Sequence, residues 1–296
     1  MESSFSKKRR LSLRILMTGL LNCSFITGTR LTEQERLIAL IEKHASTSNR
    51  RVFHLDFEGD CYVVKMQQKK RSKIGYYILT MIAKVFSIPA LRGIPILGGK
   101  LTQDIEIKRL ASLSAAGILV PKVVYEGQNY FVMSCLGNSN FDFLLKNPGP
   151  QSLVFYWKQA LAAILDVHHK GAYLSQAFVR NMIAQEGLSV GFVDFEDDPG
   201  AVMPINLAQT RDWLLCFLSS SLRLDISPQK QAEIILSYLK QDRIDVQEEV
   251  FACASKIALL RFIFRRAKLY HNRDLQSINA FIQVMRELIT YRSASS

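Results

Sequence analysis

Four polar residues of this sequence stand where an apolar run ends or is interrupted: Lys65, Glu106, Asn181 and Asp194. Lys65 follows a Tyr-Val-Val run, so its ammonium is expected to project from a half-buried strand. Glu106 falls on the apolar face of a predicted helix, where an unpaired carboxylate is costly to bury. The sequence therefore predicts a Lys65–Glu106 ion pair. The alternative is a solvated glutamate at the edge of a helix.

The other two residues each end a distinct segment. The loop that ends at Asn181 reads HKGAYLSQAFVRN over residues 169–181, and Asp194 ends the apolar run LSVGFVD over residues 188–194. The order of strand lysine, helix glutamate, loop asparagine and strand-ending Asp-Phe resembles the protein-kinase-like superfamily. The resemblance covers about residues 49–222.

This resemblance implies an ATP- and Mg²⁺-dependent site in a two-lobed α+β fold, with a small β-rich lobe before a helical one. Lys65 would hold the α- and β-phosphates, and Glu106 would orient Lys65. Asn181 and Asp194 would hold Mg²⁺. A hinge between the lobes is expected near residues 134–138. The resemblance further implies nucleotide contacts at Ser134 and Cys135 and a buried aspartate that braces the loop, Asp212.

Two departures from the family pattern bear on catalysis. The family places an aspartate five residues before the loop asparagine, where it accepts the proton of the substrate hydroxyl; here that residue is Gln176, which cannot act as a base. No G-x-G-x-x-G run precedes Lys65, and the turn before it offers only Gly59. Loss of a general base costs about 10²–10⁴-fold in rate, whereas positioning and electrostatics carry most of phosphoryl transfer. Gln176 therefore weakens the case for catalysis without excluding it.

An acidic run, Asp-Phe-Glu-Asp-Asp, begins at Asp194 and places Glu196 where the family has glycine. Glu196 or Asp197 could add a metal contact or supply a substitute base. The alternative is a solvated acidic turn, ended by Pro199 and Gly200.

Within the superfamily, the sequence resembles the bacterial lipopolysaccharide-core and Kdo kinases. The similarity lies in the spacing of apolar and glycine residues over residues 110–133 and in the His168-x-x-Gly171 motif just before the loop. Those relatives phosphorylate sugars of a membrane-anchored glycolipid at the inner face of the membrane. The resemblance therefore implies a cytoplasmic phosphotransferase, peripheral at that face, that acts on a hydroxyl of a membrane-associated sugar or lipid.

Changes in apolar periodicity predict the elements that would position these residues. Strands are predicted at residues 52–57, 61–66, 120–125, 130–133 and 188–194. A helix is predicted at residues 31–44, with Thr32 and Glu35 as a capping box. A second has Thr102 as its N-cap and Gly117 just past its end. Further helices are predicted at residues 151–169, 205–222, 228–240, 247–270 and about 274–291. The predicted regions are a basic N-terminal segment with a helix (1–48), a small lobe with an insertion at 67–100 (49–137), and a helical lobe (138–296).

Composition limits the class of protein and its partners. With 296 residues, of which 48% are hydrophobic and 22% charged, the chain can build one two-lobed domain. A net charge of +12 implies an anionic partner such as a phospholipid surface, a phosphate-rich ligand or nucleic acid. Nucleic acid ranks last, because the basic residues are not interleaved with an aromatic platform on any one element.

The number and spacing of the cysteines give no sign of a disulfide framework. Five are present, an odd number, and none forms a C-x-x-C pair. This pattern argues against a set of disulfides or a structural zinc site and fits a reducing compartment.

Two segments combine basic and apolar residues. In the insertion, the basic run 69–73 precedes the aromatic and branched segment 74–97, which favours a segment lying on an anionic membrane; Pro89 is awkward for a long buried helix. The stretch 256–268 fits a packed helix with a basic edge better. The N-terminus, basic at 7–10, is expected to touch a membrane or to be mobile rather than to be a cleaved signal, and no spanning helix is expected.

Two hypotheses of function remain. In the first, the chain is an active ATP- and Mg²⁺-dependent phosphotransferase. In the second, Gln176 marks a pseudokinase, a catalytically impaired nucleotide-binding or scaffold module at the membrane. Turnover, rather than nucleotide binding, separates the two.

Overall fold

The computed structural model describes residues 32–47, 50–67, 83–84, 86–94, 98–137, 139–147, 152–185, 189–264 and 273–295. The chain divides into two units, Met1–Arg50 and Arg51–Ser296. The described part of the first unit is helix α2 (Glu33–Thr47). The predicted capping box is present at its start, because Glu35 N donates to Thr32 Oγ1 at 3.3 Å and Thr32 N donates to Glu35 Oε2 at 2.9 Å.

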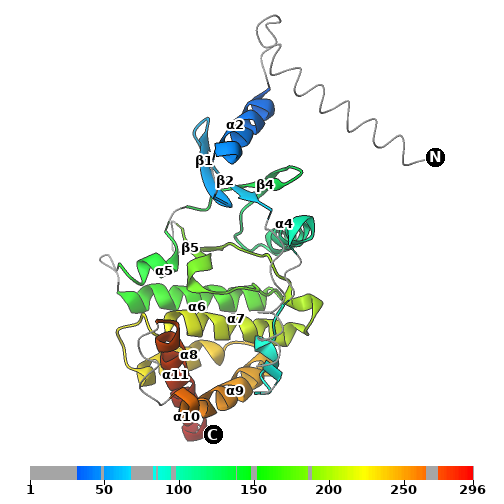
Figure 1. Cartoon of the computed structure of the whole chain (residues 1–296). Coiled ribbons are helices and arrows are strands. Elements are labelled where there is room, and N and C mark those ends of the chain that lie inside the picture. Colours follow the sequence, from blue (N-terminus) through cyan, green and yellow to red (C-terminus); the bar gives the residue numbers. More distant parts are fainter. Residues whose placement is uncertain are drawn as a thin grey trace, which may run out of the picture. The chain divides into compact units, whose positions relative to one another are not determined.

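The second unit begins with a four-stranded antiparallel sheet in the order β1-β2-β4-β3 (Figure 1). Its strands are β1 (Val52–Phe57), β2 (Asp60–Met66), β3 (Val123–Glu126) and β4 (Tyr130–Ser134). Strands β1 and β2 form a hairpin whose two loop residues, Glu58 and Gly59, both have positive φ. Such a turn matches the right-handed twist of the flanking strands, so it fixes the register of the hairpin. One face of this hairpin carries the side chains of the candidate site.

Helix α4 (Gly99–Ala115) follows the insertion and buries the predicted face of Glu106, Leu110 and Leu113. The prediction that Thr102 is the N-cap was wrong. The helix begins three residues earlier, after Gly98, and Thr102 Oγ1 instead accepts a hydrogen bond from Gly98 N at 2.7 Å inside the first turn. Gly98 has a φ of 74°, a conformation that glycine adopts without strain, and this starts the helix early.

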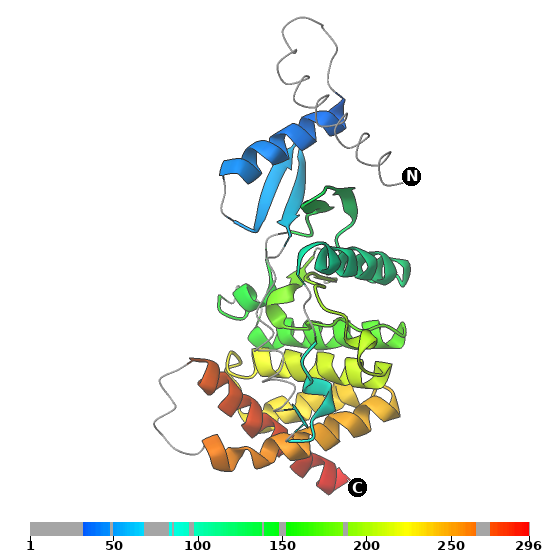
Figure 2. The ribbon, with the colours of Figure 1, turned by 45° about the vertical axis from the view of Figure 1, so that its right-hand side comes forward.

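The second lobe is helical and stacks its helices beneath the sheet and α4 (Figures 1 and 2). Its helices are α5 (Phe141–Leu144), α6 (Leu153–His169), α7 (Ile205–Ser220), α8 (Pro228–Leu239), α9 (Ile244–Leu259), α10 (Arg261–Phe264) and α11 (Arg273–Ser295). The predicted helix 247–270 is not continuous, since α9 ends at Leu259 and a separate short helix begins at Arg261; residues 265–272 lie outside the described residues. Trp157 and Trp213 are fully buried in one core that also includes β4 residues such as Phe131.

Two short strands, β5 (Met182–Ala184) and β6 (Val190–Phe192), pair as an antiparallel hairpin in the helical lobe. The prediction of a single strand at residues 188–194 was incomplete. Strand β5 is only three residues long and follows directly on the 3-10 helix η2 (Val179–Asn181), so it leaves no alternation in the sequence. Strand β6 ends at Phe192, and Asp194 therefore lies in the loop beyond it.

The described part of the insertion packs on the helical lobe. It includes the 3-10 helix η1 (Pro89–Leu91), and Arg211 of α7 donates from Nη1 to the carbonyls of Ala90 and Arg92, both at 3.1 Å. Ala90 itself is buried. The basic run 69–73 of the insertion and the N-terminal basic run lie outside the described residues. Among the described helices, none combines the length and apolar character needed to cross a bilayer.

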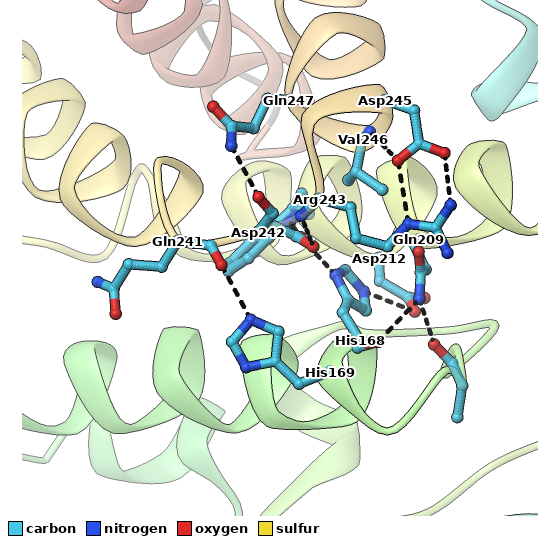
Figure 3. Close-up of polar contacts among 12 residues, drawn as sticks. His168, His169, Gln209, Asp212, Gln241, Asp242, Arg243, Asp245, Val246 and Gln247 are labelled. Carbon is cyan, nitrogen blue, oxygen red and sulfur yellow. Dashed lines mark hydrogen bonds and ion pairs between the residues drawn. The ribbon is translucent and has the colours of Figure 1, made fainter.

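A buried histidine links helices α6 and α7 to the loop between α8 and α9 (Figure 3). His168, at the end of α6, makes a contact of 2.7 Å from Nδ1 to Asp242 Oδ2 and one of 3.6 Å from Nε2 to Asp212 Oδ2. Trp213 Nε1 donates to the same Asp242 oxygen at 2.6 Å. Burial by itself lowers the pKa of His168, but the two carboxylates of Asp212 and Asp242 together outweigh burial and hold the pKa above its ordinary value.

We expect the change His168→Gln to destabilise the fold most at acidic pH. A raised folded-state pKa gives stability that is complete below the unfolded value of about 6.5 and is lost as pH rises through the folded value. The loss should reach about 3–5 kcal/mol near pH 6, because one partner of a buried charged network is removed. Urea unfolding at about pH 6 and pH 9 measures it.

His169→Gln is the matched control, since His169 is exposed and, within the described part of the chain, has one polar side-chain contact, from Nε2 to the Gln241 carbonyl at 2.9 Å. A destabilisation by His168→Gln that is the same at both pH values would show that His168 is neutral in the folded protein.

Candidate nucleotide and metal site

Three carboxylates converge on the ammonium of Lys65. Its Nζ lies 2.7 Å from Glu106 Oε1, 3.0 Å from Asp194 Oδ1 and 2.9 Å from Glu196 Oε1. Lys65 is 6% exposed and Glu106 is 2% exposed, so the predicted Lys65–Glu106 ion pair is present and buried. Burial alone lowers the pKa of Lys65, but Glu106 and the two other carboxylates outweigh it and raise the pKa above its ordinary value. The lysine is therefore charged.

The local fold explains why these groups meet. Lys65 lies near the end of β2, an inner strand, and its Cα pairs with Val52 on one side and Phe131 on the other. Glu106 reaches it from the buried face of α4. The same Glu106 oxygen accepts a weak hydrogen bond of 3.4 Å from Phe195 N, so the carboxylate also anchors the loop after Asp194. Burial raises the pKa of Glu106, and Lys65 opposes that rise.

Asp194 lies in the loop after β6, and Asn181 is the last residue of the 3-10 helix η2. Val193 N donates to the Asn181 carbonyl at 3.0 Å, which joins η2 to the chain directly before Asp194. Asp194 has a φ of 73°, in the left-handed region that aspartate tolerates better than most residues. Its side chain is 32% exposed. Asn181 Nδ2 donates to the Gln176 carbonyl at 3.0 Å, which leaves the amide oxygen Oδ1 as the atom that can meet a cation.

A cavity of about 490 Å³ lies between the sheet and the helical lobe. Lys65, Asp194 and Gln176 line it, whereas Asn181 is not a lining residue and bonds to the backbone carbonyl of Gln176. The remaining walls are Arg51, Val52, His54, Val63, Pro121, Met133, Ser134, Cys135, Leu136, Gly137, Asn140, Arg180, Ile183, Val193 and Glu196. The structure thus brings Lys65, Glu106 and Asp194 into contact, and it places Asn181 one backbone hydrogen bond from Val193, the residue before Asp194.

Ser134 and Cys135 lie where β4 leaves the sheet, and both line the cavity. Ser134 Oγ accepts a hydrogen bond from Lys122 N at 2.9 Å, and Cys135 N donates to the Cys61 carbonyl at 3.0 Å. The segment is therefore held to the neighbouring strands. Contact of Ser134 and Cys135 with a nucleotide stays a prediction.

Asp212 is fully buried on α7, and its Oδ2 accepts a hydrogen bond of 2.6 Å from Leu174 N. Arg211 adds a contact from Nε to the Ser175 carbonyl at 3.3 Å. Ser175 has a φ of 81°, an uncommon value for serine, so the loop before Gln176 is held in a conformation that needs support. The expected bracing contact of Asp212 with the loop is present.

Glu196 is held by two cations. Besides Lys65, it forms an ion pair with Arg51. Burial raises the pKa of Glu196, but Lys65 and Arg51 outweigh burial and hold the pKa below its ordinary value. A carboxylate in that state is a weak proton acceptor, so this geometry favours a metal contact by Glu196 over a substitute base.

Asp197 differs sharply from its neighbour. It is 5% exposed, it contacts the Gln176 side chain, and no hydrogen-bond donor among the described residues reaches its Oδ1. Burial raises the pKa of Asp197 to about 6, although Arg211 opposes the rise. A pKa close to neutral suits a proton acceptor. Nothing in the sequence distinguished Asp197 from Glu196, because only the path of the loop decides which carboxylate meets Gln176.

The structure also places His54, Cys61 and Cys135 side by side, with one potential ligand atom from each within 4.8 Å of the others. No motif in the sequence indicated this cluster. The hairpin register could have indicated that His54 and Cys61 share a face, since Cys61 pairs with Asp56, two residues after His54. The proximity of Cys135 depends on the order of the strands.

No family model and no curated protein matches the sequence. Among solved structures, the chain is similar to the Rio2 kinase from Chaetomium thermophilum, with 15% identity and a TM-score of 0.39 over 94% of this chain and 88% of that chain. The fold is the expected two-lobed α+β fold, with a small β-rich lobe before a helical one.

The residues fit a nucleotide and Mg²⁺. An excess of carboxylate over ammonium surrounds Lys65, and Asp194 is the most exposed of the three acids, so a cation has a ligand at the cavity wall. The Asn181 amide oxygen would be a second ligand if it turned toward Asp194, since its Nδ2 already donates to the Gln176 carbonyl. The cavity volume falls within the range of small-molecule sites, about 300–1,000 Å³.

We expect Lys65→Met to destabilise the protein by about 3–5 kcal/mol, because it leaves buried carboxylates without their cation. Lys100→Met, which removes an exposed pair with Asp104, should change the free energy of unfolding by less than about 1 kcal/mol. Denaturant unfolding measures both. Equal effects of the two changes would show that Lys65 is not a buried electrostatic centre.

Asp197→Asn is expected to stabilise the fold at neutral pH. A carboxyl whose folded-state pKa is about 6 instead of 3.8 favours the folded state fully below pH 3.8, and this contribution is lost as pH rises through 6. Asparagine removes a cost of up to about 3 kcal/mol at pH 7.5. Thermal unfolding at about pH 7.5 and pH 4 tests this, because the gain should vanish at the lower pH. Asp225→Asn, at an exposed aspartate, is the control.

Proposed function

We propose that the chain is an ATP- and Mg²⁺-dependent phosphotransferase. The observation that carries the proposal is that Lys65, paired with the buried Glu106, and Asp194 meet at one cavity, while Asn181 is joined to the Asp194 loop through Val193 N. An ammonium oriented by a carboxylate, beside two oxygen ligands for a metal, is the equipment that phosphoryl transfer requires.

In this function, Lys65 would hold the phosphates of the nucleotide and Glu106 would keep its ammonium in place. Asp194 and Asn181 Oδ1 would hold Mg²⁺, with Glu196 close enough to Lys65 to share that role. The metal supplies charge neutralisation for the transferred phosphoryl group. The contact of Asp212 with Leu174 N keeps the loop that carries Gln176 and Asn181 in register with α7.

Asp197 is the proposed acceptor for the proton of the substrate hydroxyl. Gln176 occupies the position of the usual base and lines the cavity, and its side chain contacts the Asp197 carboxylate. Gln176 would position the hydroxyl, and Asp197 would take its proton. The missing carboxylate of the loop would thus be replaced from the neighbouring loop rather than lost.

The acceptor we propose is a hydroxyl of a membrane-associated sugar or lipid. Support comes from the sequence, namely its net charge of +12 and the basic, apolar insertion. The identity of the acceptor is a separate part of the proposal. If it is wrong, the chain can still be a phosphotransferase that acts on another hydroxyl.

Binding of ATP should depend on Mg²⁺ and on Asp194. We expect Asp194→Asn to weaken Mg²⁺-dependent ATP binding by about tenfold or more, since it removes a metal ligand. Asp104→Asn, at the exposed pair with Lys100, should leave binding unchanged. Isothermal titration with and without Mg²⁺ measures the effect. A wild-type chain that binds no ATP would contradict the proposed function.

Transfer of labelled phosphate from ATP into an envelope lipid extract tests turnover. Asp197→Asn should lower the rate by about 10²–10⁴-fold while ATP binding persists. ATP binding without turnover by the wild type would favour the scaffold hypothesis that Gln176 raises. Turnover unaffected by Asp197→Asn would show that Asp197 is not the proton acceptor.

A further inference from the structure

One histidine and two cysteines meet at the hinge edge of the cavity. His54 comes from β1, Cys61 from β2 and Cys135 from the segment after β4. His54 Nδ1 lies 3.9 Å from Cys61 Sγ and 3.8 Å from Cys135 Sγ. Both cysteines are free and partly buried, and His54 is exposed, so an ion from solvent can reach the three ligand atoms.

The spacing of these atoms suits a tetrahedral ion. With zinc–sulfur and zinc–nitrogen bonds of about 2.3 and 2.05 Å, the sulfur-to-nitrogen edge of a tetrahedron is about 3.6 Å. The two measured edges exceed that value by only a few tenths of an ångström. Small rotations of the side chains would close the site.

The backbone holds the cluster in place. Cys135 N donates to the Cys61 carbonyl at 3.0 Å, which ties the two cysteines together independently of their side chains. Gly137 N donates to Cys135 Sγ at 3.4 Å, the kind of outer contact that stabilises a thiolate ligand. Asp56 pairs with Cys61 across the hairpin ladder, so it lies on the same face of the hairpin as His54 and Cys61.

We propose that His54, Cys61 and Cys135 form a zinc-binding site at the hinge edge of the cavity. Two thiolates and one imidazole are the donor set that selects Zn²⁺ over Mg²⁺ or Ca²⁺. The site is distinct from the Asp194 and Asn181 oxygens, which suit a hard cation. Zinc here joins both strands of the β1–β2 hairpin to the segment after β4.

Zinc and a nucleotide would share part of the cavity wall. His54 and Cys135 line the cavity, whereas Cys61 is not among its lining residues. This consequence rests on the proposed function: if the cavity takes ATP, bound zinc restricts the edge at Cys135 and lowers ATP affinity. The zinc site itself does not depend on ATP binding.

The test is a titration of the reduced, metal-free full chain, without nucleotide, using Zn²⁺ in competition with a chromophoric chelator. We expect one equivalent to bind. Co²⁺ in its place should show thiolate-to-cobalt charge transfer that is lost in Cys61→Ser and in Cys135→Ser. Each of these variants and His54→Ala should weaken Zn²⁺ binding by more than the 10–100-fold typical of losing an outer-shell partner.

Cys253→Ala, which changes a buried cysteine of α9 outside the cluster, is the matched control and should bind Zn²⁺ like the wild type. The proposal is overturned if the reduced chain binds no stoichiometric Zn²⁺, if binding survives both serine changes, or if the cysteines only form a disulfide on oxidation. ATP titrations with and without Zn²⁺, on the wild type and Cys61→Ser, then test the coupling. If zinc binds without an effect on ATP affinity, the proposed coupling between zinc and ATP is wrong, while the zinc site itself is supported.

Discussion

The burial of one ammonium among carboxylates governs the organisation of the small lobe and the loop beneath it. Lys65 brings together Glu106 from α4, and Asp194 and Glu196 from the loop after β6. None of these groups can be left alone in a low-dielectric interior without a large cost, so each fixes the position of the others. The sheet, the helix and the loop are thereby held in one relative arrangement, and the cavity forms where they meet.

A second buried network, in the helical lobe, holds the loop that carries Gln176. His168 lies between Asp212 and Asp242, and Asp212 also receives the backbone N–H of Leu174. The same aspartate therefore braces the core of the helical lobe and the loop that carries Gln176. Positive φ values at Ser175 and Asp194 show that both loops adopt conformations which the backbone does not prefer, and these networks supply the support that such conformations require.

The acidic loop shows how one cluster of like residues can divide its roles by environment. Glu196 faces Lys65 and Arg51, which hold the pKa of its carboxyl low, whereas burial raises the pKa of Asp197 to about 6 beside Gln176. Two adjacent carboxylates thus receive opposite shifts. This is the pattern by which proteins separate a metal or phosphate partner from a proton acceptor. Under the proposed function, Gln176 alone is therefore not sufficient to classify the chain as inactive.

Local sequence determined a large part of this protein. The apolar strand before Lys65 placed this lysine, and the helical period placed Glu106 on a buried face. A two-residue turn set the register of the first hairpin. All three features depend on residues that are close in the chain. Strand β5 was missed, because a strand of three residues shows no alternation in the sequence. The start of α4 was misplaced, because the conformation of Gly98 begins the helix earlier than Thr102. Tertiary structure alone decided which acid meets Gln176 and brought Cys135 to Cys61 and His54. Those contacts join residues far apart in the chain, and their distances follow from strand order and loop paths that no local pattern encodes.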